Sequence, residues 1–176
     1  AKDINSYDYA IIAVGAHNME MPIPHDNSNI VSSWDVLNGQ EVTGDCVVIG
    51  GGLVGAETAE YLANKGHQVT IVEMMDKIAA GESTTVLPLM MKDFADHNVK
   101  QLVNTKVDHI ENNIVYTEND QIKADTIINA LGSKKNIFDD SSITIPHVCV
   151  GDCSGERTAD IASAIRTAYK AANEID

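Results

Sequence analysis

The sequence is poor in basic residues. It has 12 Lys and Arg against 26 Asp and Glu, which gives a formal net charge of -14. A protein that binds nucleic acid needs clustered Lys and Arg to meet the phosphates, and here these residues are spread along the chain. We therefore expect no nucleic-acid partner. The acidity indicates solubility without pointing to a particular function.

Long apolar runs are also absent. No run approaches the roughly 20 residues that a membrane helix needs, so no membrane partner is expected. The first residues, Ala1–Ile4, are too polar for a secretory signal, and we expect a cytoplasmic protein. The sequence starts without Met, immediately before a strand-like run, and we expect this start not to be a natural terminus.

Cysteine is scarce. Cys46, Cys149 and Cys153 are an odd number with no CxxC pair, which fits a reducing compartment better than a disulfide framework. Core packing is expected for each of them. The six His residues are scattered without the spacing of a metal site, so no metal is expected.

Short apolar runs dominate what the chain does contain. The runs at residues 9–14, 46–49 and 69–72 are rich in Val and Ile and end at Gly or an acidic residue, a pattern typical of buried parallel strands. Between the last two, residues 54–65 carry apolar side chains at helical spacing, and Gly66 follows as a stop signal. The helical positions are Ala56, Ala59, Leu62 and Ala63.

A second helix and a small antiparallel meander are predicted next. The helix covers residues 86–97, capped by Thr84 or Thr85, with Pro88 tolerated in its first turn. Strand 100–103 follows, and then come short alternating segments separated by Asn and Asp turn signals. These segments are 107–110, 114–117 and 121–123, with turns at Asn112–Asn113 and Asn119–Asp120. We predict an α/β fold: a Rossmann-like parallel sheet with helices on it plus the β-meander, in three ββα layers.

The end of the chain predicts two more strands and a helix. The strands are residues 126–132 and 148–152, and the helix covers residues 159–175. Its apolar positions are Ile161, Ala164, Ile165 and Ala168. The stretches at 21–33 and 133–142 are candidate domain crossings.

A Gly-rich turn of the form GxGxxG lies at residues 50–55. The motif alone is a weak signal, but here it follows a strand and opens a helix, the context in which it binds a dinucleotide. Gly50 allows the tight turn, Gly52 leaves room for the pyrophosphate, and Gly55 lets the helix pack on the sheet. The alternative is a Gly-rich turn without a ligand. The candidate cofactor residues here are Gly50, Gly51, Gly52, Leu53, Val54 and Gly55.

Glu73 ends the next strand, where a carboxylate accepts hydrogen bonds from the adenosine ribose and repels a 2′-phosphate. No Arg follows, so NAD is favoured over NADP, although Lys77 softens that preference. An exposed strand-end acid is the alternative. Met74 is a further candidate contact, although the pairs Met74–Met75 and Met90–Met91 are also typical of packing residues.

Tyr61 and Lys65 have the YxxxK spacing of short-chain dehydrogenases, but they lie on the first helix after the Gly-rich turn. An ordinary helix pair one turn apart is favoured. No acid or base stands out as a partner for the nicotinamide, so the catalytic residues are unknown and a freestanding dehydrogenase is disfavoured.

Three motifs in order resemble the two-dinucleotide-binding flavoprotein reductases, with the pyridine nucleotide-disulfide oxidoreductase fold. The similarity is greatest to the C-terminal part of the old-yellow-enzyme-like group of 2,4-dienoyl-CoA reductase, enoate reductase and trimethylamine dehydrogenase. Residues 9–16, YAIIAVGA, look like the strand that leaves the FAD domain. Residues 48–57, VIGGGLVGAE, look like the NAD fingerprint, and Val150–Asp152 looks like the flavin-ribityl motif.

The resemblance implies that an NAD-binding domain, residues 41–137, is inserted into an FAD domain whose pieces are residues 1–40 and 138–176. It implies that Asp152, with Gly15 and Gly151 beside it in the motifs, binds the flavin. Residues Ala130, Leu131 and Gly132 would line the dinucleotide cleft. Glu57 would lie at the nicotinamide end, with an exposed helix acid as the alternative.

Two departures narrow the resemblance. The lack of CxxC disfavours the disulfide reductases. Because the chain has a single GxGxxG, the loop that binds the FAD pyrophosphate is expected to lie outside it. Any FMN and iron-sulfur cluster would also be bound outside this chain. The expected function is to deliver hydride from NADH to FAD, for reduction of an unsaturated substrate in the remainder of a longer polypeptide. The fragment alone is expected to be inactive. The alternative is a non-catalytic NAD- or ADP-binding or redox-sensing domain.

Overall fold

The computed structural model describes residues 4–155 and 161–175. The chain forms two compact units, one made of Asn18–Gly132 and one made of Ala1–His17 with Ser133–Asp176. Strands β2 (Ala16–Asn18) and β11 (Ser133–Lys135) pair where the chain passes between the units. Each unit is considered separately below.

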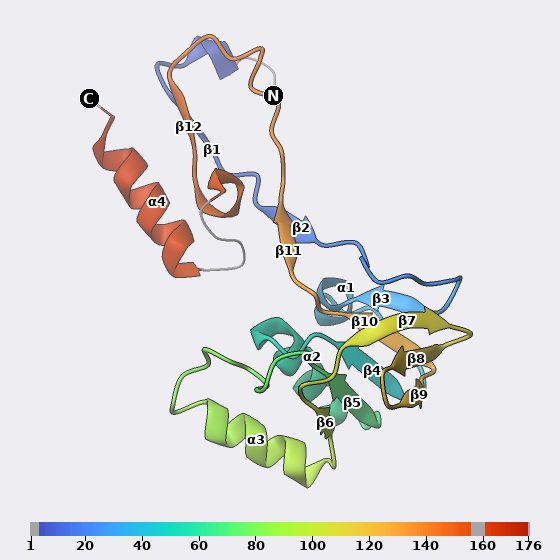
Figure 1. Cartoon of the computed structure of the whole chain (residues 1–176). Helices are drawn as coiled ribbons and strands as arrows, with labels where there is room; N and C mark the ends of the chain where they lie inside the picture. The colour runs from blue at the N-terminus through green and yellow to red at the C-terminus, as the bar shows by residue number, and fades with distance from the viewer. Residues whose placement is uncertain (1–3, 156–160, 176) are drawn as a thin grey trace. The chain divides into compact units, whose positions relative to one another are not determined.

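The larger unit is built on a parallel sheet of five strands (Figure 1). In sheet order these are β3 (Ile30–Ser32), β10 (Thr126–Asn129), β4 (Cys46–Ile49), β5 (Val69–Val72) and β6 (Lys100–Leu102). β3 lies in the stretch at 21–33 that the sequence marks as a domain crossing. Its apolar run is too short to reveal a strand, and it is recruited to the sheet edge by pairing with β10.

Both faces of this sheet are covered. Because side chains alternate along a strand, Val48 of β4 packs with α1 (Ser33–Leu37), α2 (Leu53–Asn64) and α3 (Leu87–Asp96). Val47 faces the antiparallel meander. The meander strands are β7 (Val107–Glu111), β8 (Ile114–Thr117) and β9 (Gln121–Lys123). The structure confirms the predicted α/β class and its three ββα layers.

The helix α2 and the first meander turn follow their sequence signals closely. The predicted apolar stripe of α2 is buried, at Ala56, Ala59, Leu62 and Ala63. Gly66 follows the helix with φ 92°. Asn112 and Asn113 both have positive φ, 53° and 59°, the backbone that a two-residue hairpin turn requires.

The start of α3 corrects the predicted cap. Neither Thr84 nor Thr85 caps it: the N-cap is Val86, and the Ser83 hydroxyl accepts from its backbone N–H. The reason is that a turn begins earlier, since the Ser83 carbonyl also accepts from Val86 and Leu87. Pro88 lies in the first helical turn, as expected.

The smaller unit contains β1 (Ala10–Ile12), which pairs in parallel with β12 (His147–Cys149). Its described residues also form two short 3-10 helices, η1 (Ile4–Ser6) and η2 (Gly151–Ser154), and the helix α4 (Ile161–Asn173). The expected burial of residues 9–14 is only half right, because Ile11 and Val14 are exposed. A two-stranded sheet has too few partners to cover both faces.

Only part of the predicted apolar face of α4 packs in this unit, because Ala164 and Ala168 are half-buried and the two Ile residues are exposed. Ile161 is 80% and Ile165 65% exposed, and the buried positions are Ser163 and Ala171. Of the helix predicted over 159–175, residues 159 and 160 lie outside the described residues.

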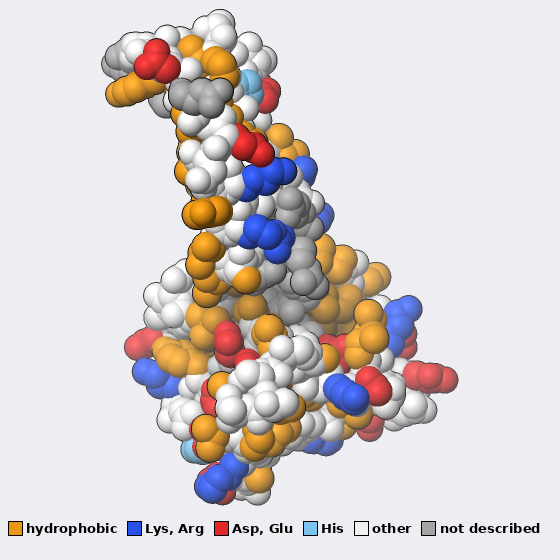
Figure 2. Space-filling view, turned by 90° about the vertical axis from the view of Figure 1, so that its left-hand side faces the viewer, with side chains coloured by type: hydrophobic (Ala, Val, Ile, Leu, Met, Phe, Trp, Pro, Cys, Tyr) orange, Lys and Arg blue, Asp and Glu red, His pale blue; other side chains and the backbone are white. Residues whose placement is uncertain are grey.

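Hydrophobic side chains also reach the surface of the larger unit, where Figure 2 shows them among charged ones. Met74 is 67% and Met75 57% exposed, so this pair is not packed as expected, whereas Met90 is buried. Among the described helices, none is long and apolar enough to cross a membrane.

We predict that Phe94→Ala lowers the free energy of unfolding by about 3–5 kcal/mol, because it removes a fully buried ring from the core on the helix side of the sheet. Leu89→Ala on the same helix removes a side chain that is 66% exposed, and should change stability by less than about 0.5 kcal/mol. Urea titrations followed by circular dichroism compare the two. Equal losses would show that α3 does not pack as described.

Candidate functional site

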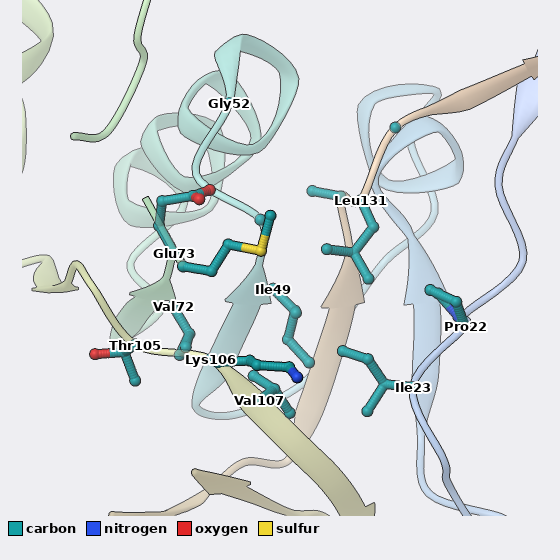
Figure 3. Close-up of a pocket in the computed structure, with 14 residues that line it drawn as sticks. Pro22, Ile23, Ile49, Gly52, Val72, Glu73, Thr105, Lys106, Val107 and Leu131 are labelled. Atoms are coloured by element: carbon teal, nitrogen blue, oxygen red, sulfur yellow. The ribbon is translucent and has the colours of Figure 1, made fainter. Parts of the chain in front are cut away.

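A pocket of about 460 Å³ lies at the carboxyl end of the larger unit's sheet (Figure 3). In open α/β sheets this edge is where ligands bind. Its walls come from the ends of β4, β5 and β10, from the loop before β3, and from the segment joining β6 to β7. The lining residues are Pro22, Ile23, Ile49, Gly50, Gly52, Val72, Glu73, Met74, Thr105, Lys106, Val107, Ala130, Leu131 and Gly132.

The Gly-rich turn is fixed on two sides. The Gly50 N–H donates to the Val72 carbonyl at 2.9 Å. A Cβ on Gly50, whose φ is +102°, would lie 2.5 Å from the Ala130 carbonyl oxygen. Gly51 donates its N–H to Glu73 Oε2 at 2.6 Å and accepts from the Ala79 N–H at 2.7 Å. The turn is therefore in close contact with the ends of both neighbouring strands, β5 and β10.

Gly55 and Gly52 have opposite surroundings. A Cβ on Gly55 would lie 1.9 Å from the Gly50 carbonyl oxygen, whereas a Cβ on Gly52 would have nothing within 4 Å. Gly52 is the N-cap of α2, whose first N–H groups have no acceptor within the helix. The open space beside Gly52 thus adjoins a helix N-terminus, which favours an anion.

Glu73 is buried, with 9% of its surface exposed, so the alternative of an exposed strand-end acid is wrong. Its two carboxylate oxygens accept from the Gly51 N–H at 2.6 Å and the Met75 N–H at 2.7 Å. These two bonds orient the carboxylate at the pocket wall, where Figure 3 shows it next to the Gly-rich turn.

The opposite wall is held by Asn129, which sequence reasoning missed. Its buried amide donates to the Met19 carbonyl at 2.7 Å and accepts from the Leu131 N–H at 3.3 Å. The Met19 N–H in turn donates to the Gly132 carbonyl at 2.9 Å. The only available signal was the polar residue that ends an otherwise apolar strand.

The predicted residues of the larger unit thus divide into two sets. Those that line the pocket are Gly50, Gly52, Glu73, Met74, Ala130, Leu131 and Gly132, while Gly51, Leu53, Val54, Gly55 and Glu57 do not. Glu57 is exposed on α2. Thr105, Lys106 and Val107 were missed, although they follow the predicted strand at 100–103 and parallel strands end at one edge. Pro22 and Ile23 had no comparable signal.

The smaller unit has its own pocket, of about 400 Å³, at the carboxyl ends of β1 and β12. It brings Gly15 and Gly151 together, with φ values of 70° and 66°. The Gly151 N–H donates to Thr167 Oγ1 of α4 at 2.8 Å. The residues that line this pocket are Ala13, Gly15, Val150, Gly151, Asp152, Ile161 and Ala164.

The cysteines are free thiols. Burial, and then the negative charges of Asp45 and Asp125, raise the pKa of Cys46 to about 11. Burial, and then the neighbouring Cys153 thiol, also raise the pKa of Cys149. Cys46 and Cys153 are buried, as expected, and Cys149 is half-buried. Within the described residues, no group of three or more His, Cys, Asp or Glu side chains could hold a metal ion.

Two known proteins share sequence with this chain at high identity. Bilirubin reductase of Mediterraneibacter gnavus is 45% identical over 175 residues, which cover 94% of this chain and 27% of that protein. NADH oxidase of Thermoanaerobacter brockii is 48% identical over 80 residues, 42% of this chain and 12% of that protein. The chain therefore spans about a quarter or less of these relatives.

A solved structure shows the same fold. The complex of 2-naphthoyl-CoA reductase with 2-naphthoyl-CoA superposes with a TM-score of 0.83 at 26% identity, covering 96% of this chain and 27% of that one. The family described as pyridine nucleotide-disulphide oxidoreductase matches residues 2–147. The chain belongs to this family of oxidoreductases, whose members bind FAD and NAD(P)H.

Proposed function

We propose that the chain is the dinucleotide-binding part of an NADH-dependent flavin oxidoreductase of the old-yellow-enzyme-like group. The observation that carries the proposal is the pocket in which open Gly52, at the start of α2, faces the same space as the buried Glu73 carboxylate. When bound, NADH supplies a hydride and FAD accepts it. The residues of this chain bind and orient these groups.

The pocket fits a dinucleotide along its length. The helix N-terminus and the space at Gly52 suit the pyrophosphate, and the Glu73 carboxylate suits the adenosine ribose hydroxyls. The opposite end is apolar, with Leu131, Ile23 and Pro22, and suits the nicotinamide. A carboxylate at the ribose and no Arg beside it favour NADH over NADPH.

The pocket of the smaller unit fits one end of a flavin. Gly15 and Gly151 open the two strand ends, and Asp152 lies at the pocket wall, where its carboxylate would accept hydrogen bonds from the ribityl hydroxyls. The FAD pyrophosphate would need a second Gly-rich turn. That turn would come from the remainder of a longer polypeptide, which we propose as the partner of this chain.

The domain assignment is proposed in a modified form. β3 and α1 belong to the sheet unit, so we place the NAD-binding domain at residues 18–132. The flanking residues 4–17 and 133–175 would be FAD-domain pieces. The exposed Ile161, Ile165 and Tyr169 on α4 support this, because the missing part of such a domain would cover them.

The substrate is proposed from two relatives. Bilirubin reductase and 2-naphthoyl-CoA reductase are named for the reduction of conjugated molecules. We therefore propose an unsaturated substrate, reduced outside the two units described here.

The central test is a fluorescence titration of the purified chain with NADH, NADPH and ADP. We expect NADH to bind most tightly. A similar response to all three would contradict a dedicated NADH site and support a non-catalytic nucleotide-binding domain. Separately, an upstream sequence of the full-length polypeptide without a second Gly-rich fingerprint would contradict the flavoprotein assignment.

We predict that Gly52→Ala weakens NADH binding roughly tenfold or more, because the methyl group enters the open space assigned to the pyrophosphate. Its effect on stability should stay within about 1 kcal/mol, since φ is -64° and nothing lies nearby. Asn64→Ala at the far end of α2 serves as the control. NADH titrations and thermal melts measure both; unchanged affinity in Gly52→Ala would refute this placement of the phosphates.

Gly55→Ala should instead act on the fold. Its Cβ would collide with the Gly50 carbonyl, so we expect a loss of about 2 kcal/mol or more in unfolding free energy. Urea denaturation of this variant beside Gly52→Ala measures the contrast. If both variants were equally stable, the described approach of α2 to β4 would be wrong.

Glu73→Gln should reduce the preference for NADH over NADPH roughly tenfold, because the neutral amide no longer repels a 2′-phosphate. It also leaves one of the two backbone donors, Gly51 or Met75, without its acceptor, so NADH itself should bind more weakly. Glu111→Gln makes the same chemical change at an exposed meander position. The ratio of the two dissociation constants is the readout, and a ratio unmoved by Glu73→Gln would contradict the assigned role.

A further inference from the structure

Two neighbouring methionines follow β5, and both have exposed side chains. The chain has six methionines, all within the described residues, and Met74 and Met75 are the two that are exposed, by 67% and 57%. The others, Met19, Met21, Met90 and Met91, are buried or half-buried. A peroxide oxidises a methionine thioether to the sulfoxide. Met74 and Met75 are therefore the methionines most open to that reaction.

Only one of these two methionines belongs to the pocket of the larger unit. Met74 is among the lining residues, whereas Met75 is not. Met74 directly follows Glu73, whose carboxylate is assigned to the adenosine ribose, so Met74 lies at the adenosine end of the pocket. A change of polarity at Met74 therefore alters a wall that the ligand contacts, whereas the same change at Met75 does not.

The backbone on both sides of Met74 is held in place. The Glu73 carbonyl accepts from the Thr105 N–H at 2.9 Å, and the Met75 carbonyl accepts from the Asn104 N–H at 2.8 Å. The Met75 N–H also donates to the Glu73 carboxylate at 2.7 Å. These three bonds fix the segment at the pocket edge, so a modified Met74 side chain stays beside the ligand site.

The cysteine thiols are poorer targets for a peroxide. Cys46 and Cys153 are buried, and Cys149 is half-buried. Burial raises the pKa of Cys46 and of Cys149, which lowers the fraction of reactive thiolate at neutral pH. The sulfur atoms that a peroxide reaches most readily are therefore those of the two exposed methionines.

We propose that Met74 is a site of oxidation that lowers nucleotide affinity: its thioether packs against the adenosine end of the dinucleotide, and its sulfoxide binds that end more weakly. In the reaction, hydrogen peroxide transfers one oxygen atom to the Met74 sulfur. The sulfur is oxidised by two electrons, the O–O bond breaks, and water is released. This inference rests on the proposed function, because it assumes that a dinucleotide occupies the pocket.

The weaker binding follows from the chemistry of the sulfoxide. Oxidation converts a flexible apolar side chain into a polar one. It therefore removes the favourable contact that a thioether sulfur makes with an aromatic ring, here the adenine.

The test measures ADP and NADH affinity before and after treatment with hydrogen peroxide, in the wild-type chain, Met74→Leu and Met75→Leu. Leu is apolar and close to Met in volume, and it has no sulfur. Each chain is compared with its own untreated state. Oxidation should weaken binding roughly threefold to tenfold in the wild type and in Met75→Leu, the loss of one sulfur–aromatic contact. Treated Met74→Leu should keep its untreated affinity.

Protection by a ligand gives a second readout. A ligand and a modification that oppose each other at one site do so reciprocally, so bound ADP should slow the oxidation of Met74 and leave that of Met75 unchanged. Mass spectrometry of the Met75→Leu chain follows Met74, and the Met74→Leu chain follows Met75. Nicotinamide mononucleotide, the other half of the dinucleotide, should protect neither. Equal oxidation of Met74 with and without ADP would overturn the proposal.

Dithiothreitol distinguishes the two kinds of sulfur, because it reduces disulfides and sulfenic acids but leaves methionine sulfoxide. Recovery of affinity with dithiothreitol would place the effect on a cysteine and overturn the proposal. An equal loss in Met74→Leu, or a Met74 sulfoxide with unchanged affinity, would do the same. Thermal melts check that affinity is lost without unfolding, and unfolding of the oxidised chain would also overturn it. An untreated wild type that binds no nucleotide would instead contradict the proposed function.

Discussion

The pocket of the larger unit depends on how closely α2 approaches the carboxyl end of β4. A Cβ on Gly55 would lie 1.9 Å from the Gly50 carbonyl oxygen, so this approach exists only because residue 55 has no side chain. It brings the start of the helix to the sheet edge, with Gly52 lining the pocket. The Glu73 carboxylate then ties the turn to β5 through the Gly51 N–H. One missing side chain thus lets the ends of two strands and a helix form a single wall.

The second constraint is that the sheet is covered on both faces. Alternate residues of the same strand, Val47 and Val48, belong to the meander core and the helix core respectively. The meander therefore does more than fill space: the segment that leads into β7 forms the wall opposite α2. Glu73 follows β5 and Lys106 follows β6, and both line one pocket. The two segments are held together because the Thr105 N–H donates to the Glu73 carbonyl. The charge pattern of the site follows from the layer arrangement.

Local signals in the sequence predicted most of the larger unit. The apolar residues of helix α2 recur at helical spacing, and Gly66 ends the helix. The pair Asn112–Asn113 favours a tight turn. In both cases residues that are neighbours in the sequence suffice to specify the structure. Residues that act through distant partners were missed. β3 has three residues and becomes a strand by pairing with β10, and Asn129 has its role only because Met19 lies beside it. The cap of α3 was misplaced by one or two residues for a smaller reason, an early turn at Ser83.

The two units share the geometry of their pockets but differ in how far they bury the faces of their sheets. In each, parallel strands end at a pocket edge and Gly residues with positive φ open it, Gly50 in one and Gly15 with Gly151 in the other. The larger unit buries both faces of its sheet within itself. In the smaller unit the sheet of β1 and β12 has two strands, and Ile11, Ile161 and Ile165 stay exposed, although burial of such side chains is what stabilises a small domain. On the proposed function, the larger unit alone is then sufficient to bind the nucleotide. Flavin binding by the smaller unit requires further apolar residues, from the remainder of a longer polypeptide, that would cover Ile11, Ile161 and Ile165.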